Sequence, residues 1–234
     1  MGKTATQARY SVAVADDADT VRAAQRLRNE VFGLDRPGGL DIDPFDEFCD
    51  HIVVRATDSG EVVGTYRLLP PGRTDRLYSE GEFDLDALRG VRADVVEAGR
   101  SCVHPAHRSG AVITLLWGAL ARYVLLSGHR WLAGSASVSL ADGPDLATTA
   151  WTRAAEHLSP PELRVRPYQP WTPPGPPSCQ PPLPPLLQGY LRLGAWVCGP
   201  PAHDPDFGTA DLFVLLSMDR VHPRYLEFFL AARG

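Results

Sequence analysis

Residues 94–127 read DVVEAGRSCVHPAHRSGAVITLLWGALARYVLLS, and this stretch decides the fold. Residues 94–103 are rich in β-forming side chains and predict a strand, whereas residues 111–127 form a continuous apolar run that predicts a buried helix. A loop over residues 104–110 joins them, and a second β-rich run follows at residues 130–140. The order predicts a β-α-β crossover between two parallel strands.

Upstream of this unit the sequence predicts a helix, a long loop and a hairpin. Asp17 and Asp19 can cap a helix whose apolar residues recur every three or four positions as far as Gly33. Residues 34–49 have no period and five acidic side chains, so they predict a long loop of the kind usually kept for function. Residues 51–56 and 61–69 predict two strands joined by a turn at residues 57–60, and residues 70–93 are irregular.

Downstream, the sequence predicts a helix over residues 145–157, capped by Asp145. Twelve of the 26 residues from Pro160 to Pro185 are proline, so we expect an extended, lid-like or wrapping loop at 159–186, rather than a docking ligand for a proline-reading domain. A short helix at 186–193, strands at 196–198 and 212–217, and a closing helix at 222–232 complete the prediction. We expect one domain over residues 1–234, with a mixed sheet covered by helices and a C-terminal portion completing the sheet.

Composition excludes several classes of protein. The net charge is −5, and because the only lysine is Lys3, nearly all the positive charge comes from arginines. These arginines are scattered singly along the sequence and form no basic stripe, so nucleic acid is not an expected partner. The four cysteines contain no CxxC pair, which predicts ordinary thiols and no metal site. Residues 1–10 lack the apolar core of a secretory signal. The apolar run at residues 111–127 is too short for a membrane-spanning helix and carries Arg122 in its middle. We therefore expect a cytoplasmic protein. A peripheral membrane contact stays open.

The loop at residues 104–110 is the first candidate site. It leads into a helix N-terminus, where unpaired N–H groups and the helix dipole attract anions. Gly110 permits close approach of the backbone, and Arg108 can add a charge-assisted hydrogen bond to a phosphate.

Several short motifs occur in a fixed order along the chain. R-x-x-V-F (Arg28 to Phe32), D-x-x-D (Asp43 to Asp46), G-x-x-R-L-L (Gly64 to Leu69) and E-x-x-R (Glu97 to Arg100) are shared with acyl-homoserine-lactone synthases. The continuations GRSCV (99–103), LWG (116–118) and GYLRLGA (189–195) are closer to ornithine-lipid N-acyltransferases. Over residues 20–230 the chain therefore resembles the branch of the GNAT superfamily that these two groups share.

The resemblance implies a GNAT-like α/β fold with a mixed, mostly antiparallel central sheet flanked by helices. It implies transfer of a fatty acyl group from a phosphopantetheine thioester, on acyl carrier protein or CoA, to the amino group of an ornithine-like amino acid. Acyl carrier protein or CoA and a small amine acceptor are then the expected partners, and no cofactor is permanently bound. In such proteins the turn Arg108, Ser109, Gly110, Ala111 and Val112 holds the donor phosphate.

The strand at residues 94–103 supplies the expected chemistry. An amino acid amine is mostly protonated at neutral pH, so Glu97 is the candidate general base, with Arg100 beside it in the motif. Residues three apart in a regular strand face opposite sides, so both line one cleft only if a bulge intervenes, and Gly99 is suitably placed for it. Backbone N–H groups near Cys102 and Val103 are the candidate oxyanion donors.

Charges of both signs are candidates for acceptor binding. Arg28 and Arg67 can pair with a carboxylate, Asp43 and Asp46 can face an amine or fix those arginines, and Phe32 completes the motif. The alternative is a charge network that holds the loop at residues 34–49 to the sheet.

Two other functions stay open from the sequence. The first is an acyl-homoserine-lactone synthase that uses S-adenosylmethionine as acceptor. The second is a non-catalytic acyl-carrier-binding module.

Overall fold

The computed structural model describes residues 9–231, so residues 1–8, with most of the N-terminal segment considered above, and residues 232–234 lie outside it. The strands are β1 (Tyr10–Val14), β2 (Asp50–Ala56), β3 (Val62–Leu69), β4 (Phe83–Asp84), β5 (Val95–Val103), β6 (Trp131–Ser139), β7 (Arg166–Pro167), β8 (Trp196–Val197), β9 (Ala202–Asp204) and β10 (Thr209–Ser217). The α-helices are α1 (Ala18–Val31), α2 (Ala111–Leu126), α3 (Asp145–Ala154), α4 (Pro185–Arg192) and α5 (Pro223–Ala231).

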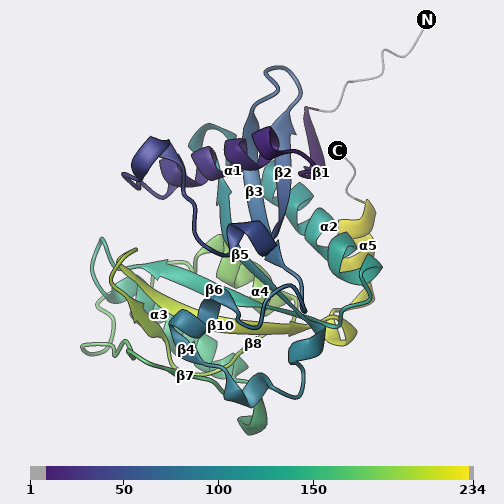
Figure 1. Ribbon diagram of the computed structural model, residues 1–234. Coiled ribbons are helices and arrows are strands. Elements are labelled where there is room, and N and C mark those ends of the chain that lie inside the picture. Colours follow the sequence, from purple (N-terminus) through teal and green to yellow (C-terminus); the bar gives the residue numbers. More distant parts are fainter. Residues whose placement is uncertain (1–8, 232–234) are drawn as a thin grey trace, which may run out of the picture. The chain divides into compact units, whose positions relative to one another are not determined.

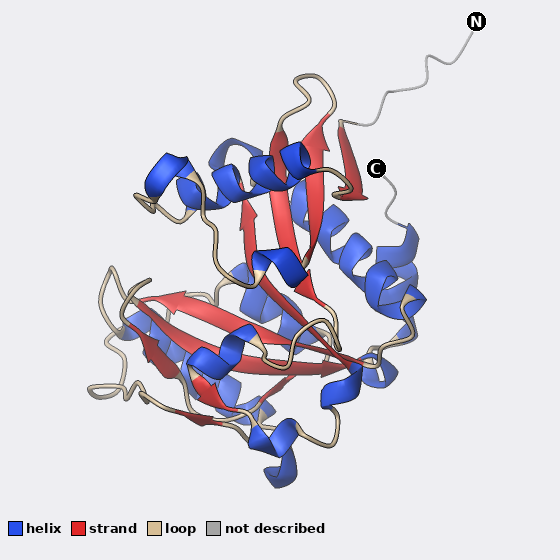
Figure 2. Ribbon diagram, in the orientation of Figure 1, coloured by secondary structure: helices blue, strands red, loops and turns tan. Residues whose placement is uncertain are grey.

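Eight strands form one sheet in the order β1-β2-β3-β5-β6-β10-β8, with β9 paired to β10, while β4 and β7 form a small separate sheet (Figure 1). The pairs β1–β2, β2–β3, β6–β10, β8–β10 and β9–β10 are antiparallel, and β5–β6 is parallel. Helices flank the strands (Figure 2). The expected mixed, mostly antiparallel sheet and the β-α-β crossover are confirmed.

Contacts divide the chain into two compact units, and β5 contributes to both. The first unit holds the described residues up to 68, residues 99–127 and residues from 223. The second holds residues 69–98 and 128–222.

In the first unit, α1 and α2 both pack on the hairpin of β2 and β3. The side chain of Asp17 caps α1, as predicted, by accepting a hydrogen bond from the N–H of Thr20 at 2.7 Å. A Cβ at Gly64 would lie 2.5 Å from Cγ1 of Val112, so the glycine lets α2 approach the sheet closely. α5 packs along α2.

Strand β1 is absent from the sequence prediction. It pairs with β2 from Tyr10 opposite Ala56 to Val14 opposite Ile52. Tyr10, Val12 and Val14 alternate with smaller residues, but a run of five residues is a short signal, and the partner strand β2 completes the definition of this edge strand.

In the second unit, β10 is buried at every residue between β6 on one side and β8 and β9 on the other. Gly134 on β6 is required for close approach, because a Cβ there would lie 2.1 Å from the carbonyl oxygen of Ala98. Full burial of Phe213 on β10 contributes roughly 1.5–3 kcal/mol to the unfolding free energy of this core.

Part of the proline-rich stretch is hydrogen bonded to the second unit. We call residues 165–171 the strap. The N–H of Tyr168 donates to the carbonyl of Glu82 at 2.9 Å, and the N–H of Trp171 donates to the carbonyl of Pro201 at 2.8 Å. The strap therefore extends the ladders of β4 and β9 rather than running free.

The predicted cap at Asp145 is wrong. Pro144 occupies the cap position of α3 without a side-chain hydrogen bond, and Asp145 is the first helical residue. Its carboxylate instead accepts hydrogen bonds from the N–H of Ser178, at 3.0 Å, and from the hydroxyl of the same residue. Asp145 therefore fastens the proline-rich stretch to the helix.

Candidate active site

The predicted anion loop lies within the first unit. Gly110 is the N-cap of α2 with a φ of +88°, a conformation that favours glycine, and no side chain caps the helix. Arg108, Ser109, Gly110 and Ala111 are exposed, whereas the Val112 side chain is fully buried. The start of α2 therefore presents uncapped N–H groups beside an exposed guanidinium, an arrangement that can hold a phosphate.

The end of β5 supplies the other predicted donor-site residues. Cys102 is buried and Val103 is half-buried, and the Nε of Arg108 donates to the carbonyl of Val103 at 3.2 Å. Burial raises the pKa of the Cys102 thiol to about 12, so the thiol stays protonated and is no nucleophile. The oxyanion role of these two backbone N–H groups stays a prediction.

A buried charge network occupies the middle of the first unit. It combines three arginines and three aspartates: Arg28, Arg67 and Arg100 with Asp41, Asp43 and Asp46. Arg28 lies 2.9 Å from Asp41 and 2.8 Å from Asp46. Arg67 lies 2.7 Å from Asp43 and 3.1 Å from Asp46.

This network fastens the loop at residues 34–49. The Arg28 side chain is completely buried and that of Arg67 is 4% exposed, so both guanidinium groups are engaged inside the protein. Burial alone would raise the pKa of Asp46, but Arg28 and Arg67 outweigh it and hold that pKa below its ordinary value. The arrangement matches the alternative in which these charges fix the loop, and direct substrate binding by them stays a prediction.

Sequence reasoning missed two members of this neighbourhood, and Phe32 adjoins it. Asp41 is 2% exposed and lies beside Arg28, and its place in the acidic loop was the only available signal. His51 is buried with its Nε2 3.6 Å from Asp46, and desolvation lowers its pKa. Phe32 is the half-buried C-cap of α1, and its N–H donates to the carbonyl of Arg28.

The backbone of β5 is unusual at Arg100, next to Gly99, whereas the bulge expected at Gly99 stays a prediction. Parallel pairing with β6 runs from Val95 to Glu97, and Arg100 adopts a φ of +51°. That value is uncommon for a residue other than glycine. Arg100 lies 3.3 Å from Asp41 and 3.4 Å from Asp43, and these ion pairs help to hold the unusual conformation.

Glu97 lies in the second unit, where its carboxylate binds the backbone of the irregular stretch that precedes β5. It is 4% exposed, and its two oxygens accept hydrogen bonds from the N–H groups of Tyr78 at 2.6 Å and Ser79 at 2.8 Å. The hydroxyl of Ser79 lies 3.3 Å from that of Ser135 on β6. Glu97 thus holds Tyr78 and Ser79 within the irregular stretch at 70–93, a role that the sequence did not reveal.

Three carboxylates gather elsewhere in the second unit. Ligand oxygens of Glu82, Asp204 and Asp211 lie within 4.8 Å of one another, and this is the one such group among residues 9–231 that could hold a metal ion. Burial, then repulsion from Asp211, raises the pKa of Glu82 to about 9, and burial raises the pKa of Asp211. Without a bound cation, Glu82 is therefore protonated at neutral pH, and its proton can be shared with Asp211.

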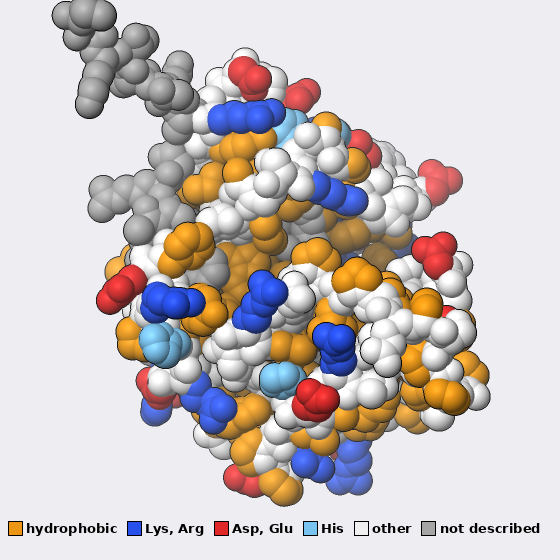
Figure 3. All heavy atoms as spheres, turned by 180° about the vertical axis from the view of Figure 1, so that it is seen from behind, with side chains coloured by type: hydrophobic (Ala, Val, Ile, Leu, Met, Phe, Trp, Pro, Cys, Tyr) orange, Lys and Arg blue, Asp and Glu red, His pale blue; other side chains and the backbone are white. Residues whose placement is uncertain are grey.

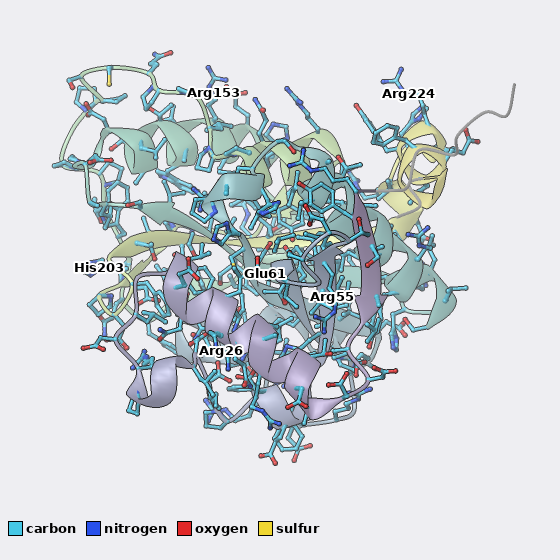
Figure 4. All side chains as sticks on the ribbon, turned by 90° about the horizontal axis from the view of Figure 1, so that it is seen from above. Arg26, Arg55, Glu61, Arg153, His203 and Arg224 are labelled. Atoms are coloured by element: carbon cyan, nitrogen blue, oxygen red, sulfur yellow. The ribbon has the colours of Figure 1, made fainter. Side chains whose placement is uncertain are left out.

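The surface agrees with the composition. On the face drawn in Figure 3, the arginine side chains are spread over the surface among hydrophobic and uncharged groups. Arg26 on α1 lies at the exposed surface (Figure 4), two positions from the buried Arg28. In the described part of the chain, no helix combines the length and the apolar character that a membrane crossing needs.

Comparison with known proteins identifies the family. The acetyltransferase (GNAT) domain family matches residues 26–118. An L-ornithine N(alpha)-acyltransferase of Rhodobacter capsulatus is 36% identical over 94% of this chain and 94% of its own length. The chain belongs to the L-ornithine N(alpha)-acyltransferase family. The Brucella abortus member of this family is 30% identical over 93% of the chain and 88% of its own length.

Membership of this acyltransferase family makes the protein an enzyme and sets aside the non-catalytic binding module. The fold also occurs in solved structures. One is BjaI, a CoA-dependent acyl-homoserine lactone synthase, which superposes with a TM-score of 0.56 at 18% sequence identity. The match covers 94% of this chain and 87% of the BjaI chain. FeeM, an N-acyl amino acid synthase from uncultured soil microbes, covers 90% of the chain and 92% of its own with a TM-score of 0.54 and 14% identity. At such identities the likeness shows the fold alone, so the lactone synthase alternative has only fold-level support.

Proposed function

We propose that this acyltransferase moves a fatty acyl group from the phosphopantetheine thioester of acyl carrier protein or CoA to the amino group of ornithine or a closely similar amino acid. The observation that carries the proposal is the 36% identity to an L-ornithine N(alpha)-acyltransferase over 94% of both chains. The exposed anion loop at the start of α2 supports it, because both donors carry a phosphate at the end of the pantetheine arm.

In the proposed donor site, the phosphate binds the first-turn N–H groups of α2 and the guanidinium of Arg108. Ser109 and Gly110 form the turn, and Ala111 and Val112 contribute backbone N–H groups. The Val112 side chain is fully buried beside Gly64 of β3, and this anchors the first turn of α2 on the sheet.

In the proposed reaction, the amine nitrogen attacks the thioester carbonyl, a C–N bond forms and the C–S bond breaks. Glu97, directly or through a water, accepts the proton that the amine loses, and the leaving thiolate takes up a proton to become the free thiol. Backbone N–H groups of Cys102 and Val103 stabilise the oxyanion. This role requires that amine or water reach a second lone pair on the Glu97 carboxylate, whose oxygens already accept two backbone hydrogen bonds.

We assign acceptor binding to the surroundings of the charge network. Arg28, Arg67, Asp43 and Asp46 position the loop at residues 34–49, with Phe32 at its start, and Arg100 joins that loop to β5. An amino acid carries both a carboxylate and an ammonium group, so a loop fixed by charges of both signs suits this class of acceptor.

The product is an amphiphile, so we also propose a peripheral membrane contact. Leu126 at the end of α2 is 86% exposed, and Phe228 on the adjoining α5 is 58% exposed. Sedimentation with vesicles of phosphatidylglycerol tests this contact. Loss of binding in Leu126→Ser is the expected result, and equal binding by this variant contradicts it.

Lipid mass spectrometry of cells that overproduce the protein tests the function directly. An acylated ornithine that is absent from control cells names both substrates. Purified enzyme with acyl carrier protein or CoA thioesters should then release free thiol only when the amino acid is present. Release with S-adenosylmethionine but not with ornithine would refute the proposal in favour of the lactone synthase.

A further inference from the structure

Tyr10 and His107 form a contact that links strand β1 to the anion loop. The two residues are 97 positions apart, and the Tyr10 hydroxyl lies 3.0 Å from Nδ1 of His107. Their rings meet edge to face with centroids 5.7 Å apart and an interplanar angle of 76°. Because Tyr10 is only 5% exposed, its hydroxyl has little access to water, and the contact with His107 fixes the imidazole in place.

This contact selects one tautomer of His107. A phenol is a good hydrogen-bond donor and a neutral imidazole nitrogen a good acceptor, so the favoured arrangement has Tyr10 donating to Nδ1. In neutral imidazole the other nitrogen then carries the proton. Nε2 of His107 is therefore an N–H donor, whereas the opposite tautomer would present a lone pair that repels an anion.

His104, in the same loop, uses its ring differently. Its Nδ1 accepts a hydrogen bond from the N–H of Ala106 at 3.2 Å, and its Nε2 lies 3.4 Å from a carboxylate oxygen of Glu30. Both nitrogens of His104 thus serve the protein itself. The His107 side chain is half-buried. Among residues 9–231, no carboxylate pairs with its Nε2 as Glu30 does with Nε2 of His104.

His107 precedes Arg108 and lies three residues before Gly110, within the turn that carries the proposed donor site. We propose that His107 is a donor-binding residue whose Nε2–H hydrogen bonds to the phosphate of the phosphopantetheine arm, and that Tyr10 is the positioning residue that fixes its tautomer. The inference rests on the proposed function, since it concerns the same donor. It adds a side-chain ligand to a site otherwise made of backbone N–H groups and Arg108.

The experiment compares two acyl donors that differ in their phosphate. Acyl-CoA carries phosphate, whereas the acyl thioester of N-acetylcysteamine carries the same thioester and part of the arm without any phosphate. His107→Leu is expected to raise KM for acyl-CoA about tenfold or more, as loss of a charge-assisted hydrogen bond requires, with little change in kcat. With the N-acetylcysteamine thioester, KM should be the same for His107→Leu and the wild type.

Two further variants test the tautomer. His107→Gln places an amide N–H near the position of Nε2 and is expected to restore most of the affinity for acyl-CoA. Tyr10→Phe keeps the ring and removes the hydroxyl, so we expect KM for acyl-CoA to rise about threefold, but not to rise further in a His107→Leu background. His104→Gln is the matched control, because disturbing the loop fold should affect both donors alike.

The outcomes separate the inference from the function. If the wild type turns over neither donor with any amino acid, the proposed function is wrong. If the wild type is active and His107→Leu raises KM equally for both donors, the phosphate contact is wrong. If His107→Leu fails to fold, as judged by circular dichroism, Tyr10→Phe decides: an unchanged KM for acyl-CoA overturns the inference.

Discussion

Replacing Arg28 with methionine tests the charge network most directly. The side chain is completely buried, 2.9 Å from Asp41 and 2.8 Å from Asp46. Removing one partner of a buried ion pair typically costs about 3–5 kcal/mol of unfolding free energy, because a charge is left without compensation. Here Arg67 still lies 3.1 Å from Asp46 and Arg100 3.3 Å from Asp41, so we expect the lower end, about 3 kcal/mol.

Urea unfolding followed by circular dichroism measures this loss. Arg26→Met is the matched control, since it removes the same chemical group from an exposed position on the same helix and should cost less than about 0.5 kcal/mol. The double variant Arg28→Met with Asp46→Asn should lose less than the sum of the single losses, because the two residues interact. A loss for Arg28→Met below about 1 kcal/mol, or equal to that of Arg26→Met, would refute the network as a stabilising element.

Three other predictions concern the second unit. Glu97→Gln should lower kcat at neutral pH by about 10²-fold or more with little change in the donor KM, and an unchanged kcat removes Glu97 from the base role. The raised pKa of Glu82, about 9, means that the folded state holds a proton that the unfolded state releases near pH 4.5, so stability falls as pH rises between these values. Between pH 7 and 9 the wild type should therefore lose more unfolding free energy than Glu82→Gln, by an amount on the order of 1–3 kcal/mol, and parallel pH profiles would contradict this. Gly134→Ala should cost about 1–3 kcal/mol, because its Cβ would lie 2.1 Å from the Ala98 carbonyl oxygen, and an unchanged melting temperature would show that β5 moves aside freely.

Most of the regular structure was predictable because long apolar runs have a clear period. Helix α2 and strands β5 and β6 follow directly from the quoted stretch, and the cap of α1 at Asp17 follows from its residue type. Strand β1 and the cap of α3 were not predictable from local sequence. β1 is an edge strand, and its pairing depends on the partner strand rather than on its own sequence. The Asp145 carboxylate accepts a hydrogen bond from Ser178, which lies 33 residues further along the chain, so it does not cap its own helix.

The candidate site was predictable in its members but not in their partners. Motif order pointed to Arg28, Arg67 and Arg100, and pairing of Arg28 and Arg67 with Asp43 and Asp46 was one of two open interpretations. The fold shows which of these pairs form, and it adds Asp41 and Arg100 to the network. The same holds for Glu97, whose two hydrogen-bond donors belong to the irregular segment at 70–93. Which charges meet is decided by tertiary packing, and a period of two or 3.6 residues contains no such information.

The register of the strap has a consequence for self-association. Pro170 stands opposite Ala202 as a bridge, while the flanking hydrogen bonds run from His203 to Gln169 and from Trp171 to Pro201. Pro170 and Ala202 therefore form a non-hydrogen-bonded pair of the antiparallel ladder. In such a pair the backbone nitrogen of each residue points away from the opposite strand. Because proline has no N–H there, the outer margin lacks a donor with which a strand from another molecule could pair, and this border of the fold is guarded against fibrillar growth.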